Sequence, residues 1–300
     1  MQRVLFHCGS AKTGSTAIQQ QVFLNDDILK KQGIFYCPRF VRAGNVDPLN
    51  LYLRDLKFKT DHLEKQMLVK AGQERLRTLE AEGFHTVIIS NESALGDPFH
   101  DRKTGFFPHL KATAPYVKEL FKDVEVIPLF VIRNVASLLP SFYVQRVRQG
   151  GIYSAEDYYD QVCAHDVSWI PVVQELLRLF PSAERRVVSF EWLARQEQSL
   201  GQGLFGGLLP EECLKLDRDR PSNRAAGQRA LTMMRMINRM GETYAGIAGK
   251  DPVRVQRELR DRFFPIVEKF GGEKLLLKGK LGETLTMLYQ QDLRALNIAG

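Results

Sequence analysis

Short, continuous apolar runs are spaced along the first two thirds of the chain. They lack the alternation of polar and apolar residues that marks a strand with one face in solvent. Continuous runs of this kind predict parallel strands that are buried on both faces. We expect such strands at residues 4–6, 33–36, 86–90, 124–132 and 185–190.

Between these runs, apolar residues recur at the three- and four-residue spacing of amphipathic helices. Segments rich in Gly, Pro and Asn at 38–50 and in Gly, Pro and His at 96–111 are expected to be loops. Helices are expected from Ser15 and at residues 61–82, 114–121, 134–149 (with a kink or break at Pro140) and 153–180.

Strands that alternate with helices predict an α/β fold, with a parallel sheet between two helix layers. We expect a single domain over residues 1–300. Within it, residues 1–193 would form the α/β core and residues 194–300 a mostly helical C-terminal portion. Ligands of such folds bind beyond the carboxyl ends of the strands, so the residues at those ends are the candidates for function.

A loop of small residues follows the first predicted strand and leads into the first predicted helix. It runs from Gly9 to Gly14 and contains one cation, Lys12. The first N–H groups of a helix have no intrahelical acceptor, and the helix dipole places partial positive charge there. This arrangement predicts a binding site for an anion of the phosphate type.

The position of Lys12 distinguishes this loop from that of nucleoside triphosphatases. Their P-loop places the lysine directly before Ser or Thr, whereas Lys12 lies two residues before Gly14 and Ser15-Thr16 follow that glycine. The string from Lys12 to Thr16 resembles the phosphosulfate loop of sulfotransferases that use 3′-phosphoadenosine 5′-phosphosulfate (PAPS). The resemblance implies a P-loop-type fold.

A second pattern follows the predicted strand at 124–132. Arg133 ends that strand, Ser141 comes eight residues later, and Phe142 and Tyr143 follow. Arginine can clamp a phosphate with two hydrogen bonds, and a serine hydroxyl adds another. This pattern resembles the 3′-phosphate site of the same family, and the resemblance is strongest over residues 3–21 and 86–149.

The resemblance implies transfer of a sulfuryl group from PAPS to a hydroxyl or amine, with PAP as the second product and no metal. Lys12 would stabilise the leaving group, and Glu92 is the candidate general base. A basic C-terminal loop closes over the 3′-phosphate in this family, which makes Arg224 a further candidate. The implied donor-binding residues are Ala11, Lys12, Thr13, Gly14, Ser15, Thr16, Arg133, Ser141 and Arg224.

Histidines offer alternatives to Glu92 as the base. His100 and His109 lie in the predicted loop at 96–111, whereas His7 is expected to be a packed histidine at the end of the first strand. His7-Cys8 also begins like the loop of protein tyrosine phosphatases. The arginine of that loop is replaced by Gly14, so we expect Cys8 to be a small buried residue.

Two other functions stay open. A kinase that uses ATP or GTP would require magnesium-dependent triphosphate binding. A non-catalytic protein that binds PAP would tolerate replacement of Glu92. The acceptor could be a carbohydrate, a lipid or a small metabolite, and the sequence carries no readable code for it or for the oligomeric state.

Composition narrows the cellular setting. The net charge of +7 suits an anionic ligand, yet the cations are scattered and form no stripe for nucleic acid. The sequence contains no run of about 18 apolar residues, so we expect no membrane span. The first predicted strand begins so near residue 1 that we expect no signal peptide before it. The four cysteines are far apart, which is typical of reduced thiols. We therefore expect a cytoplasmic protein.

Overall fold

The computed structural model of the chain describes residues 2–39, 46–99, 105–162, 167–181, 184–196, 199–214, 227–270, 273 and 275–300. Contacts within the chain divide it into two compact units. Unit 1 consists of Met1–Asn134, Val167–Arg220 and Leu288–Gly300, and unit 2 consists of Val135–Asp166 and Pro221–Met287. This division does not coincide with the boundary at residue 193, and the single-domain organisation stays a prediction.

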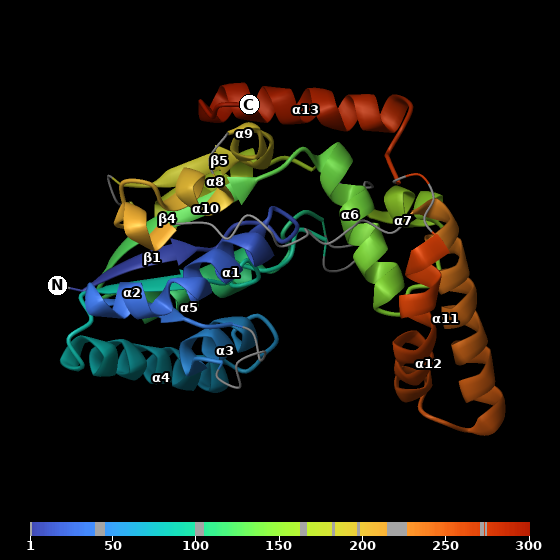
Figure 1. The fold of residues 1–300 in the computed structure, drawn as a ribbon, viewed down its shortest axis with the longest axis horizontal. Coiled ribbons are helices and arrows are strands. Elements are labelled where there is room, and N and C mark those ends of the chain that lie inside the picture. The colour runs from blue at the N-terminus through green and yellow to red at the C-terminus, as the bar shows by residue number, and fades with distance from the viewer. Residues whose placement is uncertain are drawn as a thin grey trace. The chain divides into compact units, whose positions relative to one another are not determined.

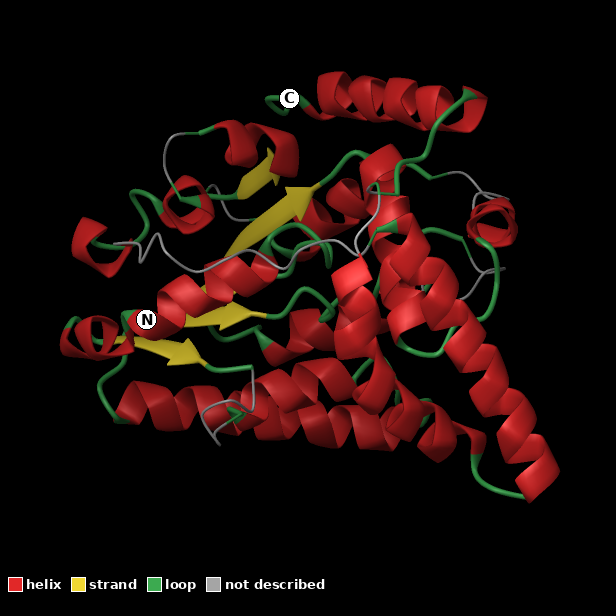
Figure 2. Ribbon diagram, turned by 45° about the vertical axis from the view of Figure 1, so that its right-hand side comes forward, coloured by secondary structure: helices red, strands yellow, loops and turns green. Residues whose placement is uncertain are grey.

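Unit 1 is built on a sheet in the order β2-β3-β1-β4-β5. Its strands are parallel, and Figure 2 shows strand arrows that point the same way. β1 lies in the centre and pairs with β3 and β4, with His7 opposite both Ser90 and Leu129. All five predicted strands are therefore present. They are β1 (Arg3–His7), β2 (Ile34–Cys37), β3 (Thr86–Ser90), β4 (Glu125–Ile132) and β5 (Arg186–Ser189).

Helices cover both faces of this sheet, which confirms the three-layer α/β fold (Figure 1). Successive residues of β1 point to opposite faces. Leu5 packs in the cluster that also holds Ile18 of α1 and Phe205 of α10, whereas the ring of Phe6 contacts Phe121 and Phe180 on the other side. The unit 1 helices are α1 (Ser15–Leu24), α2 (Asp26–Lys31), α3 (Pro48–Asp55), α4 (His62–Ala81), α5 (Leu110–Leu120), α8 (Ile170–Leu179), α9 (Phe190–Arg195), α10 (Leu200–Phe205) and the 3₁₀ helix η2 (Glu211–Leu214).

The structure corrects two expected helix bounds and leaves no break at Pro140. A helix, α3, begins at Pro48 inside the expected loop, because Asp47 caps it and proline suits the first helical position. The helix expected over 153–180 is two separate helices, α7 (Ala155–Val162) and α8. Pro140 lies inside a continuous helix, α6 (Val135–Arg148).

Unit 2 is helical and holds α6, α7, α11 (Gln228–Ala248), α12 (Pro252–Val267) and the 3₁₀ helix η3 (Glu268–Phe270). Asn238 of α11 is buried and donates to the carbonyl of Val147 in α6 and to that of Gly151, which follows α6. α13 (Lys280–Leu296) begins in unit 2 and ends in unit 1. The mostly helical C-terminal portion is thus confirmed. None of the helices in the described ranges has the length and apolar content that crossing a membrane requires.

Candidate functional site

The strand order places a topological switch point between β1 and β4. The chain leaves β1 toward β2 on one side and leaves β4 toward β5 on the other, and ligands of open α/β sheets bind in the crevice between two such strands. The loop after β1 is joined to β4 across this point. Cys8 donates to the Leu129 carbonyl at 3.2 Å, and Ser10 donates to the Val131 carbonyl at 3.3 Å.

The loop backbone has two left-handed residues, Lys12 with φ 69° and Gly14 with φ 84°. Thr13 fixes the turn, because its hydroxyl donates to the Ser10 carbonyl at 2.5 Å. A Cβ on Gly14 would lie 2.5 Å from the side chain of Leu200. Glycine is therefore required here both by the backbone conformation and by the space available.

The first turn of α1 has free hydrogen-bonding capacity for an anion. Its first N–H groups lack intrahelical partners, as in every helix. The Ser15 hydroxyl is buried and has no hydrogen-bond partner in the described part of the chain, whereas Thr16 is exposed at the same helix end. A buried hydroxyl is rarely left unpaired unless a ligand or water completes it. This end of α1 therefore fits the phosphate group that the sequence predicts.

Arg133 extends from the end of β4 to this loop. Its guanidinium donates to the Lys12 carbonyl at 2.5 Å and lies 4.8 Å from the ring centre of Phe190. Burial lowers the pKa of Arg133 from its usual value, and the charge of Glu191 opposes that effect. The backbone carbonyl of Arg133 accepts from Trp169 Nε1 at 3.0 Å. The structure thus brings together the Lys12 loop and Arg133.

The structure does not test two of the predicted donor-binding residues. Ser141 lies on α6 in unit 2, whereas Arg133 belongs to unit 1, so their joint role on one phosphate stays a prediction. Arg224 lies outside the described residues.

Glu92 lies two residues beyond β3, on the side of the sheet that α1 covers. Gln19 of α1 places its amide nitrogen 3.1 Å from Glu92 Oε2 and 3.1 Å from the Ser90 hydroxyl. Arg39, two residues beyond β2, forms an ion pair with the same carboxylate oxygen. The candidate base is therefore held by one neutral and one charged partner.

Burial keeps two side chains next to the loop, those of His7 and Cys8, uncharged near pH 7. His7 is fully buried and contacts the Ser90 hydroxyl at 2.8 Å. Burial, with a smaller contribution from Arg39, lowers the pKa of His7 to about 4, so the ring is neutral near pH 7. Burial raises the pKa of the Cys8 thiol far above its usual value, which argues against a thiolate nucleophile. Both were expected to be packed residues, and both are buried.

The structure does not test the other two histidine alternatives. His109 precedes α5 at its N-terminal end. His100 lies outside the described residues.

Arg39 and Gln19 were not among the residues expected from the sequence. Arg39 follows Cys37, the last residue of β2, by two positions. The rule that ligand-binding residues follow the carboxyl ends of strands could therefore have identified it. The contact between Gln19 and Glu92 depends on how α1 is rotated over the sheet, and no sequence pattern reports that rotation.

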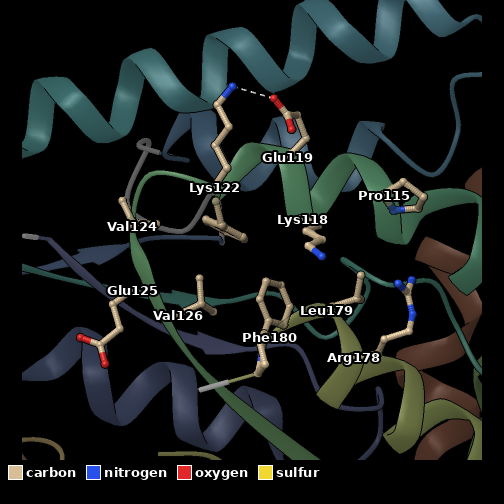
Figure 3. A pocket seen from close by; sticks show the side chains of 12 residues that line it. Pro115, Lys118, Glu119, Lys122, Val124, Glu125, Val126, Arg178, Leu179 and Phe180 are labelled. Carbon is tan, nitrogen blue, oxygen red and sulfur yellow. Dashed lines mark hydrogen bonds and ion pairs between the residues drawn. The ribbon is translucent and has the colours of Figure 1, made fainter. Parts of the chain in front are cut away.

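A hollow of about 760 Å³ lies at the opposite edge of the sheet, at the amino end of β4. Val126, Leu179 and Phe180 line it, with Lys118 and Arg178 beside them (Figure 3). Since it lies at the start of β4 and Arg133 follows the end of that strand, the hollow is not part of the loop site.

Comparison with known proteins finds no matching family model, no matching curated protein and no matching solved structure. The described residues contain no group of three or more His, Cys, Asp or Glu side chains that could hold a metal ion. The metal-free reaction stays a prediction.

Proposed function

We propose that this protein is a PAPS-dependent sulfotransferase that acts on a hydroxyl or amine of a small-molecule, lipid or carbohydrate acceptor. The observation that carries the proposal is the hydrogen bond from the Arg133 guanidinium to the Lys12 carbonyl. It joins the residue that follows β4 to the glycine loop that follows β1, at the switch point of the sheet. The Ser15 hydroxyl at the start of α1, which has no hydrogen-bond partner among the described residues, supports an anionic ligand at the same place.

In this proposal the residues of the loop have distinct tasks. The N–H groups of Gly14, Ser15 and Thr16 and the Ser15 hydroxyl hold the 5′-phosphate. Arg133 and Ser141 bind the 3′-phosphate, which ATP lacks. Lys12 stabilises the negative charge that develops on the oxygen of the leaving PAP. Glu92 accepts the proton that the acceptor loses.

The proposal includes a cytoplasmic location. Cys8, Cys37 and Cys213 are buried and form no disulfide, as is typical of proteins in reducing compartments.

Ligand-induced stabilisation tests the choice of nucleotide. PAP at a hundredfold excess over its dissociation constant is expected to stabilise the folded chain by about 2.7 kcal/mol. We expect ADP and ATP with magnesium to stabilise it less, since they lack the 3′-phosphate. Stabilisation by ATP and magnesium without an effect of PAP would contradict the proposal and favour a kinase.

Replacement of Lys12 tests its task. We expect Lys12→Ala to lower the rate of PAP formation from labelled PAPS by about a hundredfold, the cost of losing one group that stabilises transition-state charge. Lys118→Ala, at the hollow on the opposite edge of the sheet, is the control and should keep the wild-type rate. A rate within twofold of wild type in Lys12→Ala would remove Lys12 from catalysis.

A further inference from the structure

The two oxygens of the Glu92 carboxylate have different surroundings. Oε2 accepts from the Gln19 amide at 3.1 Å and pairs with the Arg39 guanidinium. Oε1 makes no hydrogen bond within the described part of the chain. The Glu92 side chain is 14% exposed, so it is largely buried without being sealed.

Both partners of Oε2 are themselves fixed. Gln19 is 1% exposed, and its amide nitrogen also lies 3.1 Å from the backbone carbonyl of Ser90. Arg39 is held a second time by the Ser93 hydroxyl at 3.4 Å. Side chains anchored at two points lose little further freedom when they orient a third group, and this is how supporting residues preorganise a site.

We propose that Gln19 and Arg39 are positioning residues that hold Oε2 of Glu92 and leave Oε1 as the atom that accepts the acceptor's proton. The inference rests on the proposed sulfuryl transfer. In that step the acceptor O–H or N–H bond breaks and its proton moves to Oε1. A bond forms between the acceptor atom and sulfur, and the bond from sulfur to the phosphate oxygen of PAP breaks with its electron pair left on PAP.

Other titratable and charged groups contact the partners of the Glu92 carboxylate. His7 is connected to it through Ser90 and Gln19 and is neutral near pH 7. Asp97 accepts from Ser93 at 3.1 Å and pairs with Lys57 at 3.0 Å. Burial lowers the pKa of Arg39, Asp97 and then Tyr36 oppose that effect, and Arg54 adds to it. As the ion-pair partner of Glu92, Arg39 favours the ionised form of the carboxylate, which is the form that accepts a proton.

The chain offers a matched control for Gln19. Gln21 lies on the same helix, is also buried, and donates to Ser199 and to the Leu214 carbonyl instead. Gln19→Leu and Gln21→Leu each remove one buried amide from α1, but only the first removes a contact to Glu92. Arg39→Lys keeps the positive charge, whereas Arg39→Ala removes it.

One readout needs no ligand or acceptor. Carbon NMR of protein labelled at the glutamate carboxyl carbon follows the titration of Glu92, whose signal is the one missing in Glu92→Gln. We expect this titration to move upward by about one pH unit in Arg39→Ala and Gln19→Leu. It should stay within a few tenths of a unit in Arg39→Lys and be unchanged in Gln21→Leu. An unmoved titration in Arg39→Ala and Gln19→Leu would overturn the inference.

The second readout is the pH dependence of PAP formation from PAPS with water as the acceptor. Its acidic limb should move upward with the NMR titration in Arg39→Ala and Gln19→Leu, and kcat should fall by about tenfold or more while the KM for PAPS changes less than twofold. If the acidic limb lies at the wild-type pH in both variants, the inference is overturned and the sulfotransferase proposal stays intact. Absence of both PAP binding and PAP formation in wild type would instead overturn the proposed function.

Discussion

At the residue scale, burial decides which of the potentially reactive side chains near the end of β1 are uncharged. The sequence places His7, Cys8 and Lys12 within a few positions, and any of them could have been reactive. Burial leaves His7 neutral and the Cys8 thiol protonated. Lys12, by contrast, is only partly buried, in the left-handed turn of the loop. The end of β1 therefore carries two uncharged side chains, and the loop that follows it carries one cation.

His7 makes stability depend on pH. Its pKa is about 4 in the folded chain and 6.5 in the unfolded one. Between these values the unfolded state binds the proton and the folded state does not, so stability falls as pH drops from 6.5 toward 4. At pH 5 the loss from this residue is about 2 kcal/mol. Urea unfolding of wild type and His7→Gln at pH 7.5 and pH 5 measures it.

We expect His7→Gln to lose less stability between these two pH values than wild type does. His62→Gln on the surface of α4 is the control and should follow the wild-type curve, because His62 is exposed. Parallel curves for wild type and His7→Gln would mean that His7 is charged in the folded protein.

At the element scale, the turn from β1 into α1 depends on Gly14. Its left-handed backbone starts the helix, and its missing side chain makes room for Leu200 of α10. The first turn of α1 is thus placed both by the loop and by a helix that is distant in the sequence. This double constraint keeps the Ser15 hydroxyl at the loop, where no described residue forms a hydrogen bond with it.

Gly14→Ala tests this constraint. Strain from the positive φ and overlap with Leu200 together should lower the free energy of unfolding by about 3 kcal/mol. Gly83→Ala separates the two causes, because Gly83 has φ 94° but nothing within 4 Å of its Cβ position. We expect that variant to lose about 1 kcal/mol. Equal losses in chemical denaturation would show that Leu200 moves aside at no cost.

At the scale of the whole molecule, the chain divides into an α/β unit and a helical unit. Lys12, Glu92, Arg133 and their contacts belong to unit 1, and Ser141 to unit 2. The two tryptophans of the chain, Trp169 and Trp192, also lie in unit 1. Trp169 donates to the Arg133 carbonyl, so tryptophan fluorescence reports on the unit that contains the loop site.

We expect PAP to raise the midpoint of the thermal transition seen by tryptophan fluorescence, since a ligand stabilises the state that binds it. The helical signal in circular dichroism comes from both units, and comparing the two midpoints shows whether unit 2 is stabilised with unit 1. A fluorescence midpoint that PAP leaves unchanged would contradict binding at the Lys12 loop.

The sequence by itself determined the strands, because runs such as Val87 to Ile89 are apolar on both faces and suit only a buried parallel sheet. It also determined the glycine loop and the strand-end Arg133, because small residues and a cation at fixed spacing follow directly from the order of residues. It predicted element boundaries less well, as α3 and the division of residues 153–180 show, since capping by Asp47 and local breaks compete with periodicity.

Only the tertiary structure decided which of these residues meet. The bond from Arg133 to Lys12 requires β1 and β4 to be neighbours, and this follows from strand order and not from spacing. The partners of Glu92 come from α1 and from the end of β2, and their approach depends on helix rotation and packing. Contacts between distant segments are set by how the whole core packs, and a local pattern of residues does not contain that information.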